Sequence, residues 1–238
     1  MTSNKLAIMH PEQYYHVFNR TNGAGRLFFS DRNFKFFLRR LGQYGKGFWE
    51  TCAYALLSNH FHLVIRICPQ DVVMSSAAPI LDNVLRRSAQ LGHRWKFQEE
   101  NIRNPLESED VDFQQKLCHL LVAEQMRRFL LSYSKAINKQ QSRHGSLLQK
   151  IFKRKMIPIE DVAQVVMYVH RNPVHHGYVR KPDDYKWSSY DAYIKDIDSK
   201  FLSKWRVLDL FDGADNLQLA HEAYNSNTLE INNLEVIL

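Results

Sequence analysis

The chain has 238 residues, 45% of them hydrophobic and 12% aromatic, a composition that suits one sizeable hydrophobic core. Its formal net charge of +7 favours an anionic partner. No segment contains the roughly 18 to 20 uninterrupted apolar residues that a membrane-spanning helix needs. The three cysteines are widely spaced, which predicts reduced thiols in a cytoplasm rather than a disulfide framework or a zinc cluster. Residues 1–15 show no basic run followed by an apolar stretch, so we expect no secretory signal.

The first part of the chain predicts, in order, a strand, a turn, a helix and two more strands. Residues 14–20 are rich in aromatic and β-branched side chains, and two glycines follow in the turn. Ser30 can cap a helix whose apolar residues recur at helical spacing until a cluster of glycines ends it. Strands over 49–57 and 61–67 are expected to form a hairpin. These elements predict an antiparallel sheet with helices on one face.

The second part of the chain begins with a stretch over residues 69–111 that we interpret as an inserted helix and loop. A long amphipathic helix is predicted over 114–138, then a strand over 148–157 with alternating basic residues, then a helix over 160–171 that Pro173 stops. We predict one domain over 1–200 and an acidic amphipathic extension over 201–238.

Charge is distributed unevenly along the sequence. Residues 127–155 contain nine Lys or Arg and no Asp or Glu, whereas residues 207–238 contain six acids and no Lys or Arg. This segregation predicts a polyanion-binding surface and an acidic tail. The alternative is a set of ordinary solvated helix faces.

Two histidines that flank Phe61 are the first candidates for chemistry. Side chains two residues apart on a strand point to the same face, so His60 and His62 can bind one divalent metal ion while Phe61 points into the core. We expect both imidazoles to face solvent. The alternative is two half-buried histidines that hydrogen-bond to the backbone.

A tyrosine and an asparagine near Pro173 form the second candidate site. Tyr168 and Asn172 are four residues apart and would share a helix face. A tyrosine beside a neutral oxygen ligand suits attack on a phosphodiester whose phosphate a metal ion polarises. The alternative is a core tyrosine and a helix-ending asparagine.

The basic run is the third candidate, because cations and aromatic rings together hold single-stranded nucleic acid. Its aromatic members, with Trp95 upstream, are Phe129, Tyr133 and Phe152, and the alternative is that they are core residues. The candidates for phosphate contact are Arg20, Arg143, Lys150, Lys153, Arg154 and Lys155.

Five motifs occur in one order: YYHVFNRT, ALLSNHFHLVIRI, KRK, YVHRNPVHHGYV and DYKWSSY. Together they cover most of residues 14–190, and the chain resembles the REP-associated tyrosine transposases, the domesticated single-tyrosine branch of the HUH nucleases. The resemblance implies an α+β, ferredoxin-like fold in which helices sandwich an antiparallel sheet. Residues 69–111 and the part after Tyr190 lie outside it.

The resemblance also implies roles for particular residues. His60 and His62 would be ligands of Mg²⁺ or Mn²⁺, Asn172 a third ligand, and Tyr168 the catalytic nucleophile. The substrate would be single-stranded DNA near imperfect palindromes, called REP elements, which are bound as hairpins. A nucleoid-associated location is implied, and relatives of the insertion-sequence type work as dimers, so a homodimer is allowed.

Residues and resemblance together predict a metal-dependent single-stranded DNA endonuclease and strand transferase that passes through a 5′-phosphotyrosine. Since the covalent link would store the bond energy, rejoining needs no nucleotide, and the sequence contains no P-loop pattern. Two alternatives stay open: a non-catalytic module that binds DNA hairpins, and an RNA-binding regulator.

Overall fold

A four-stranded sheet forms the centre of the molecule in the computed structural model, which describes residues 6–90 and 108–224. Every pair of neighbouring strands is antiparallel, and the strand order is β2-β3-β1-β4. The strands are β1 (Tyr14–Arg20), β2 (Trp49–Leu56), β3 (His60–Ile67) and β4 (Lys153–Ile157).

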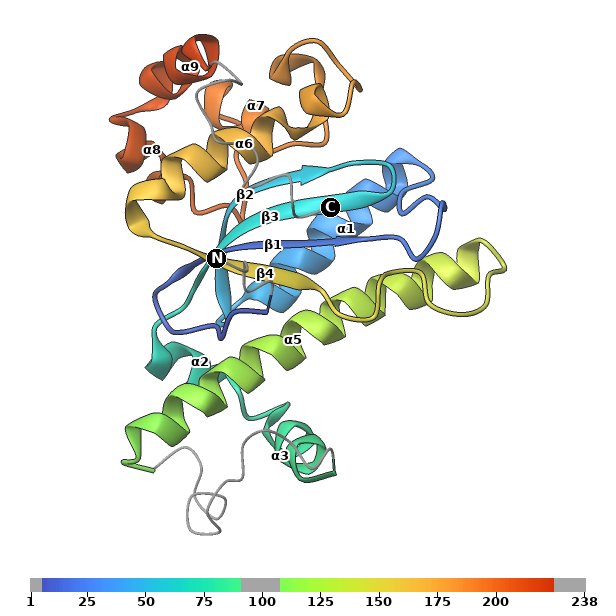
Figure 1. The fold of residues 1–238 in the computed structure, drawn as a ribbon, viewed down its shortest axis with the longest axis vertical. Coiled ribbons are helices and arrows are strands. Elements are labelled where there is room, and N and C mark those ends of the chain that lie inside the picture. Colours follow the sequence, from blue (N-terminus) through green and yellow to red (C-terminus); the bar gives the residue numbers. More distant parts are fainter. Residues whose placement is uncertain (1–5, 91–107, 225–238) are drawn as a thin grey trace.

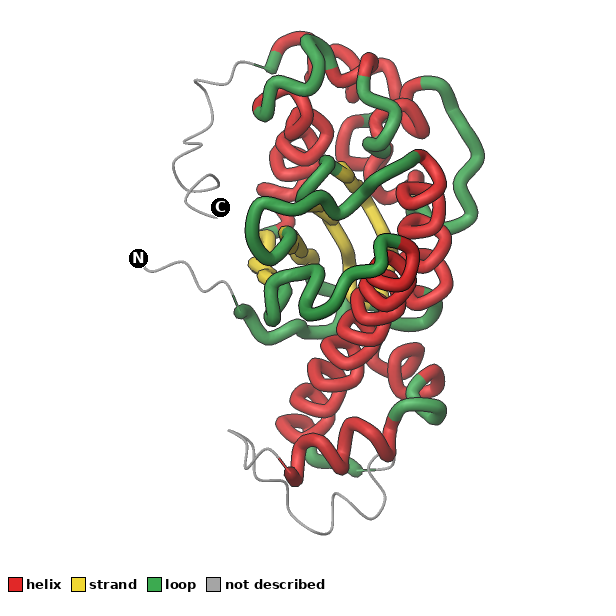
Figure 2. Tube along the Cα trace, turned by 90° about the vertical axis from the view of Figure 1, so that its right-hand side faces the viewer, coloured by secondary structure: helices red, strands yellow, loops and turns green. Residues whose placement is uncertain are grey.

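Helices cover both faces of this sheet (Figures 1 and 2). Helices α1 and α5 pack on one face and α6 on the other. The predicted α+β class, an antiparallel sheet sandwiched by helices, is therefore confirmed, and the order of β1, α1, β2, β3, α5 and β4 is ferredoxin-like. The helices are α1 (Asp31–Gly45), α2 (Gln70–Ser76), α3 (Leu81–Gln90), α5 (Val111–Gln140), α6 (Val162–His175), α7 (Tyr190–Ile194), α8 (Lys204–Phe211) and α9 (Ala214–Ala223), with 3-10 turns η1 (Ile159–Asp161) and η2 (Pro182–Asp184).

Strand alternation divides the buried side chains into two cores. On β3, Phe61, Leu63 and Ile65 belong to the core under α1 and α5, whereas Val64 belongs to the core under α6. His60 and His62 have the same parity as Val64, so they project toward α6. Phe61 is fully buried on the opposite side, as the sequence predicts.

Small side chains on β2 allow α6 to lie close to the sheet. Cys52, Ala53 and Ala55 are fully buried in the core under α6, and a bulge between Thr51 and Ala53 brings the adjacent Cys52 and Ala53 into that core. The same core contains Val166 and Tyr168 of α6. The sheet surface thus holds α6 directly above the histidines of β3.

Pro173 does not stop α6, contrary to the sequence prediction. The helix continues to His175, and its last turn is completed by hydrogen bonds from His176 N to Asn172 O and from Tyr178 N to Pro173 O. Pro173 has no N–H to donate, but the hydrogen bonds that residues beyond it make back to Asn172 and Pro173 keep the last turn helical. Asn172 is consequently helical and on the face predicted for it.

The predicted strand over 148–157 is shorter than expected, because β4 begins only at Lys153. Leu148 forms an isolated bridge with Thr21 instead, so residues 141–152 run as a loop along the end of β1. Helix α5 is longer than predicted, with Asp110 capping its first turn by accepting a hydrogen bond from Phe113 N.

The beginning of the C-terminal extension completes the core under α6. Val207 of α8 and Leu217 of α9 are fully buried there. Residues 225–238, which contain the end of the acidic tail, lie outside the described residues. Among the helices described, none is long and apolar enough to cross a membrane.

Candidate functional site

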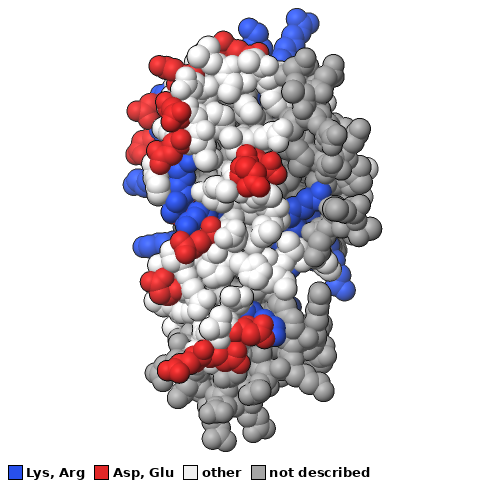
Figure 3. Space-filling view, turned by 60° about the vertical axis from the view of Figure 1, so that its left-hand side comes forward, with Lys and Arg blue, Asp and Glu red and all other residues white. Residues whose placement is uncertain are grey.

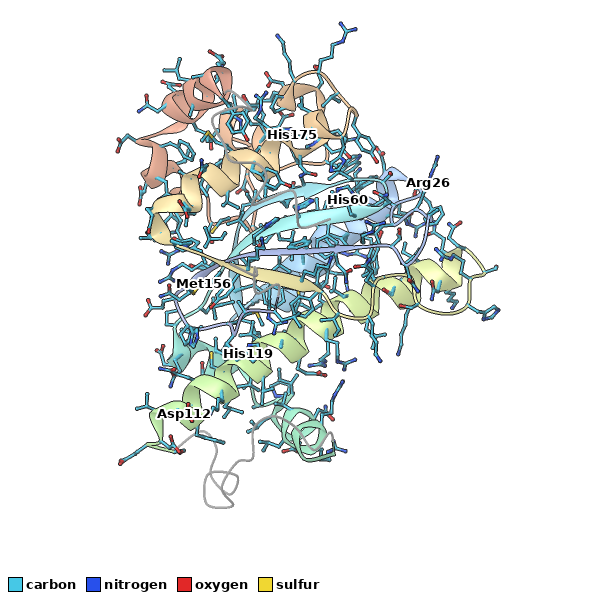
Figure 4. All side chains as sticks on the ribbon, in the orientation of Figure 1. Arg26, His60, Asp112, His119, Met156 and His175 are labelled. Carbon is cyan, nitrogen blue, oxygen red and sulfur yellow. The ribbon has the colours of Figure 1, made fainter. Side chains whose placement is uncertain are left out.

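The two histidines of β3 lie inside the protein. His60 is 6% exposed and His62 is 1% exposed, so the expectation that they face solvent is wrong. Helix α6 lies over this face of the sheet, a placement that the local pattern of β3 could not reveal. In Figure 4, His60 lies near the start of β3 below α6, which carries His175, whereas His119 projects from α5 across the sheet.

His60 is held in a form that can donate an electron pair toward α6. Its Nδ1 lies 2.7 Å from Asn59 Oδ1, and an amide oxygen only accepts, so Nδ1 carries the hydrogen and Nε2 the lone pair. That Nε2 lies 3.4 Å from Asn172 Oδ1. Burial lowers the pKa of His60 to about 4, with a further contribution from His176, so the imidazole is neutral at pH 7.

His62 lies two residues after His60 on β3, and its Nε2 is on the same side of the sheet, under α6. This nitrogen is buried and has no hydrogen-bond partner in the described structure. The other ring nitrogen, Nδ1, lies 2.8 Å from Nε2 of His16 on β1. Burial is the main cause that holds the pKa of His62 well below its usual range, so this imidazole is also neutral.

These atoms fit a divalent cation. Two imidazole nitrogens come from β3, and the Asn172 oxygen faces one of them, so electron-pair donors point at one another across a short gap. In the described ranges no three His, Cys, Asp or Glu side chains form a metal-binding group, so the candidate set is two histidines and an amide. Such a set leaves coordination positions open for phosphate oxygens and water.

Tyr168 lies over His62 and its neighbour His16 on β1. Its ring meets those of His62 and His16 edge-on, each with 6.0 Å between ring centroids. Tyr168 is 3% exposed and Asn172 is 1% exposed, and both project from the buried side of α6. The structure thus brings the pair His60 and His62 together with the pair Tyr168 and Asn172, and the sequence separates these two pairs by more than 100 positions.

The predicted phosphate contacts divide between the two faces of the sheet. On β4, Lys153 is paired in register with Phe18 and Lys155 with His16, which places both lysines on the site face. Arg154 is paired with Val17 and points the other way, where its guanidinium donates to Ala7 O and lies 3.4 Å from His119 Nε2. Arg154 is therefore not brought to the site.

Basic side chains also line two hollows beside the histidines. A small hollow contains Phe18, Arg20, His60, His62 and Lys153, and it shares Asn19 and Gln149 with a neighbouring groove of about 410 Å³. The cations that line this groove are Arg87, Arg127, Lys135 and Lys150. Arg143 lies nearby, with its guanidinium next to Gly25 in the turn after β1. Arg20 and Lys153 thus line the hollow beside the histidines, and Lys150 lines the adjoining groove.

Most aromatic residues of the basic run belong to the core. Phe129 and Tyr133 are fully buried under α1, and the Tyr133 hydroxyl donates to Leu27 O, so Tyr133 cannot stand in for Tyr168. Phe152 is 8% exposed, and Trp95 lies outside the described residues. On the face seen in Figure 3, acidic and basic side chains are interspersed, so the surplus of +7 is not a uniform basic surface there.

Sequence reasoning missed three histidines at the site. His16 bonds His62, His175 has its ring centroid 6.0 Å from that of Tyr168, and His176 has its ring centroid 4.8 Å from that of His60. A polar residue in the otherwise apolar strand 14–18 was the available signal for His16. His175 and His176 follow Pro173, where the predicted end of the helix removed any reason to place them.

One solved structure shares the fold. It is described as a REP-associated tyrosine transposase bound to a REP hairpin, with a TM-score of 0.50 and 13% sequence identity over 82% of this chain and 86% of that one. This likeness concerns the fold. No protein-family model and no curated protein sequence matches the chain.

Proposed function

We propose that this protein cleaves and rejoins single-stranded DNA beside hairpins, with Tyr168 as nucleophile and a divalent metal ion at His60, His62 and Asn172. The observation that carries the proposal is the convergence of both imidazoles, the amide oxygen and the tyrosine between β3 and α6. The fold supports it, since a solved structure with this fold is described as a REP-associated tyrosine transposase bound to a REP hairpin. Membership of that family and a homodimeric state are parts of the same proposal.

Tyr168 would attack the phosphorus of a phosphodiester. The bond from its Oη to phosphorus forms as the bond to the 3′ oxygen breaks, the hydroxyl proton is lost, and the 3′ oxygen leaves as a hydroxyl. The product is a 5′-phosphotyrosine, which a second 3′-hydroxyl can resolve by the reverse reaction. A bound divalent ion would supply charge stabilisation to the non-bridging phosphate oxygens.

The surrounding residues would position the strand. Arg20, Lys153 and Lys155 lie on the site face and would contact phosphates on either side of the scissile one. Lys153 Nζ lies 5.8 Å from the centroid of the Phe18 ring, which itself stacks near His62. Burial of Tyr168 and both histidines keeps bulk water away from the reacting atoms, so a strand has to enter between β3 and α6.

The decisive experiment is a search for a covalent adduct between the protein and single-stranded DNA hairpins with flanking sequence. The parent protein with Mn²⁺ should form an adduct that survives denaturation, and chelator should prevent it. Tyr168→Phe removes only the hydroxyl and should form none while binding the hairpin with nearly parental affinity. Tyr178→Phe is the matched control, because Tyr178 is an exposed tyrosine at the rim of the site and should still react.

The same experiment separates the alternatives. Hairpin binding by the parent without any adduct would favour the non-catalytic DNA-binding module. Tighter binding of an RNA hairpin than of the DNA hairpin of equal sequence would favour the RNA-binding regulator. An undiminished adduct with Tyr168→Phe would contradict the nucleophile assignment.

A further inference from the structure

His16 has no place in the proposed reaction, although it lies next to a metal ligand. We propose that His16 is a positioning residue that holds His62 in the orientation and tautomer that metal binding requires. This inference rests on the proposed function, because it concerns the same metal site.

The geometry makes the two imidazoles one unit. His16 Nε2 lies 2.8 Å from His62 Nδ1, and the two rings lie edge to edge, with centroids 5.0 Å apart and planes 18° apart. Phe18, which is paired in register with His62, has its ring centroid 4.9 Å from that of His16 and 5.8 Å from that of His62. His16 is 1% exposed, so the strand pairing, the hydrogen bond and the Phe18 ring hold both imidazoles in place.

One hydrogen is shared between the two ring nitrogens, and its position decides whether His62 can bind metal. If His62 Nδ1 donates to His16 Nε2, then His62 Nε2 carries a lone pair. If His16 donates instead, His62 Nε2 carries the hydrogen and cannot be a ligand. His16 therefore favours metal binding by accepting the hydrogen bond, without touching the metal or the DNA.

A structural role alone does not explain a histidine at this position. His16 Nδ1 is buried and has no hydrogen-bond partner in the described structure, and such a group opposes folding. The two positions of β1 on either side of His16 that share its face are aromatic, Tyr14 and Phe18. An apolar aromatic ring at position 16 would avoid the unpaired nitrogen. The hydrogen bond to His62 is what the imidazole adds.

The test is Mn²⁺ affinity of the DNA-free protein, measured by electron paramagnetic resonance. His16→Phe keeps a planar ring but cannot accept a hydrogen bond, and it should weaken Mn²⁺ binding about 10- to 100-fold. His16→Gln keeps an acceptor oxygen and should weaken it less. Saturating Mn²⁺ should restore adduct formation to His16→Phe. His119→Phe, a buried histidine across the sheet, is the control and should bind Mn²⁺ like the parent.

The outcomes distinguish this inference from the proposed function. Parental Mn²⁺ affinity in folded His16→Phe would overturn the role of His16 and leave the metal site intact. Failure of the parent to bind Mn²⁺ would overturn the metal site and this inference with it. Should His16→Phe not fold, the same comparison is made between His16→Leu and His16→Gln, and equal affinities would overturn the inference.

A groove on the other side of the sheet supports a second, independent inference. From its charge we infer that the groove between α1 and α5 binds the duplex stem of the hairpin, which also rests on the proposed function. The groove has a volume of about 560 Å³ and is lined by Arg32, Asn33, Lys35, Phe36 and Arg39 of α1 and by Ala136, Ile137 and Gln140 of α5.

Its three cations match a regular row of phosphates. Arg32, Lys35 and Arg39 are exposed, and within the described residues none lies within 4.0 Å of a carboxylate oxygen. Positions 32 to 39 of a helix span about 10 Å. One strand of B-form DNA presents a phosphate about every 3.4 Å along its axis, so the row spans about three phosphate intervals of one duplex strand.

The groove is formed by the first half of α1 and the end of α5, which lie toward the end of the sheet where β1 finishes and β3 begins (Figure 1). Arg26, which follows the turn after β1, and His60 both lie toward this end in Figure 4. The Arg143 side chain lies next to Gly25 in that turn. A hairpin whose flank enters the site could therefore lay its stem over this end.

The test replaces Arg32, Lys35 and Arg39 together by Gln and measures binding of a hairpin and of its stem-less single-stranded flank. The variant should bind the hairpin at least 10-fold more weakly, with a slope of log affinity against log salt that is smaller by about 0.9 for each lost contact. Its affinity for the flank should be unchanged. The control replaces Lys46, Arg86 and Lys116 by Gln, an equal loss of charge away from the groove.

Equal losses of hairpin affinity in both triple variants would overturn the inference, since they would reflect net charge alone. Unchanged hairpin binding by the groove variant would overturn it as well. Neither result bears on Tyr168, because adduct formation on the flank alone tests the proposed function separately.

Discussion

At the scale of single residues, the burial of His60 and His62 determines what their removal should do. Alanine at either position removes a proposed metal ligand and also leaves a cavity under α6. We expect His60→Ala and His62→Ala to abolish metal-dependent cleavage and to lower the free energy of unfolding by about 2 kcal/mol. Cleavage assays and urea denaturation on the same preparations measure both effects.

His119→Ala is the matched control for this experiment. His119 is 6% exposed, like His60, and accepts a hydrogen bond from Met9 N across the sheet from the site. It should lose comparable stability and keep its cleavage activity at temperatures where it is folded. Parental cleavage by either ligand variant would contradict the assignment of the ligands.

The sequence predicts site residues where a short-range rule links chemistry to position. His60 with His62 follows from strand alternation, and Tyr168 with Asn172 follows from the helical repeat. Whether the two pairs meet depends on α6 crossing the sheet, which no local rule specifies. His16 was missed for the same reason, because its contact with His62 depends on the register of β1 against β3, which places His16 opposite Val64.

At the scale of elements, the alternation of β4 separates the three consecutive basic residues. Lys153→Ala with Lys155→Ala should weaken binding of a single-stranded oligonucleotide and reduce its salt slope by about 0.7 for each lost phosphate contact. Arg154→Ala should leave the slope unchanged, because its guanidinium bonds Ala7 O on the opposite face. Fluorescence anisotropy across a salt series measures both, and equal slopes for the two variants would contradict this division.

Elements were predicted well where pattern and end signals agree. Strand β1 has the predicted bounds, because its aromatic and β-branched run ends at a turn rich in glycine. Strand β4 was predicted five residues too long, since Leu148 to Phe152 look extended but pair only through one bridge with Thr21. The predicted end of α6 at residue 171 was wrong, because hydrogen bonds beyond Pro173 support one more turn.

The contact between α6 and α9 predicts a pH dependence of stability. His170 Nδ1 lies 3.2 Å from His221 Nε2, and His170 Nε2 lies 2.8 Å from Ser189 Oγ. Burial and the nearby Arg171 lower the pKa of His221 to about 4, although Asp183 acts to raise it. Burial also holds the pKa of His170 well below its usual range. Both imidazoles are therefore neutral in the folded protein at pH values where the unfolded chain protonates them.

Histidines whose pKa is lowered by folding contribute stability above about pH 6.5, which is their pKa in the unfolded chain. This contribution is lost as the pH falls toward about 4, the pKa of His221 in the folded protein. We expect the free energy of unfolding to be flat above pH 7 and to fall below pH 6.5. His221→Gln keeps a hydrogen-bonding group that does not titrate, so its stability should fall less between pH 6.5 and 4.5. The exposed His144→Gln should behave like the parent, and identical pH profiles for all three would contradict the prediction.

At the scale of the whole molecule, the first part of the acidic extension packs on the helix that carries Tyr168. Helices α8 and α9 place Val207, Leu217 and His221 in the core under α6, the helix that carries Tyr168. Tyr224 directly follows α9. Its ring centroid lies 4.7 Å from the Arg171 guanidinium carbon and 6.4 Å from the ring centroid of His175. The packed part therefore supports the site from behind. The acidic tail predicted over 207–238 could also dock on the basic DNA-binding surface and compete with DNA, and residues 225–238 are the part of it that the packed core does not include.

Two truncations separate these roles. Ending the chain after Trp205 removes the buried Val207 and Leu217 and should lower the free energy of unfolding by several kcal/mol, about 2 to 5 for each large apolar side chain lost from the core. Adduct formation should fall with it, because α6 loses its outer support. Ending the chain after Tyr224 leaves every described core residue in place and should preserve thermal stability.

The shorter truncation then tests competition directly. Residues 225–238 contain Glu230 and Glu235, several apolar residues and no Lys or Arg, a composition that can dock on a basic, partly apolar surface. If they compete with DNA, the protein that ends at Tyr224 should bind the hairpin more tightly than the parent at low salt, and the difference should shrink as salt screens the contact. Glu230→Gln with Glu235→Gln in the full chain should reproduce part of that gain. Equal hairpin affinity of parent and truncated protein at every salt concentration would assign the whole contribution of the extension to the packing of α8 and α9 on α6.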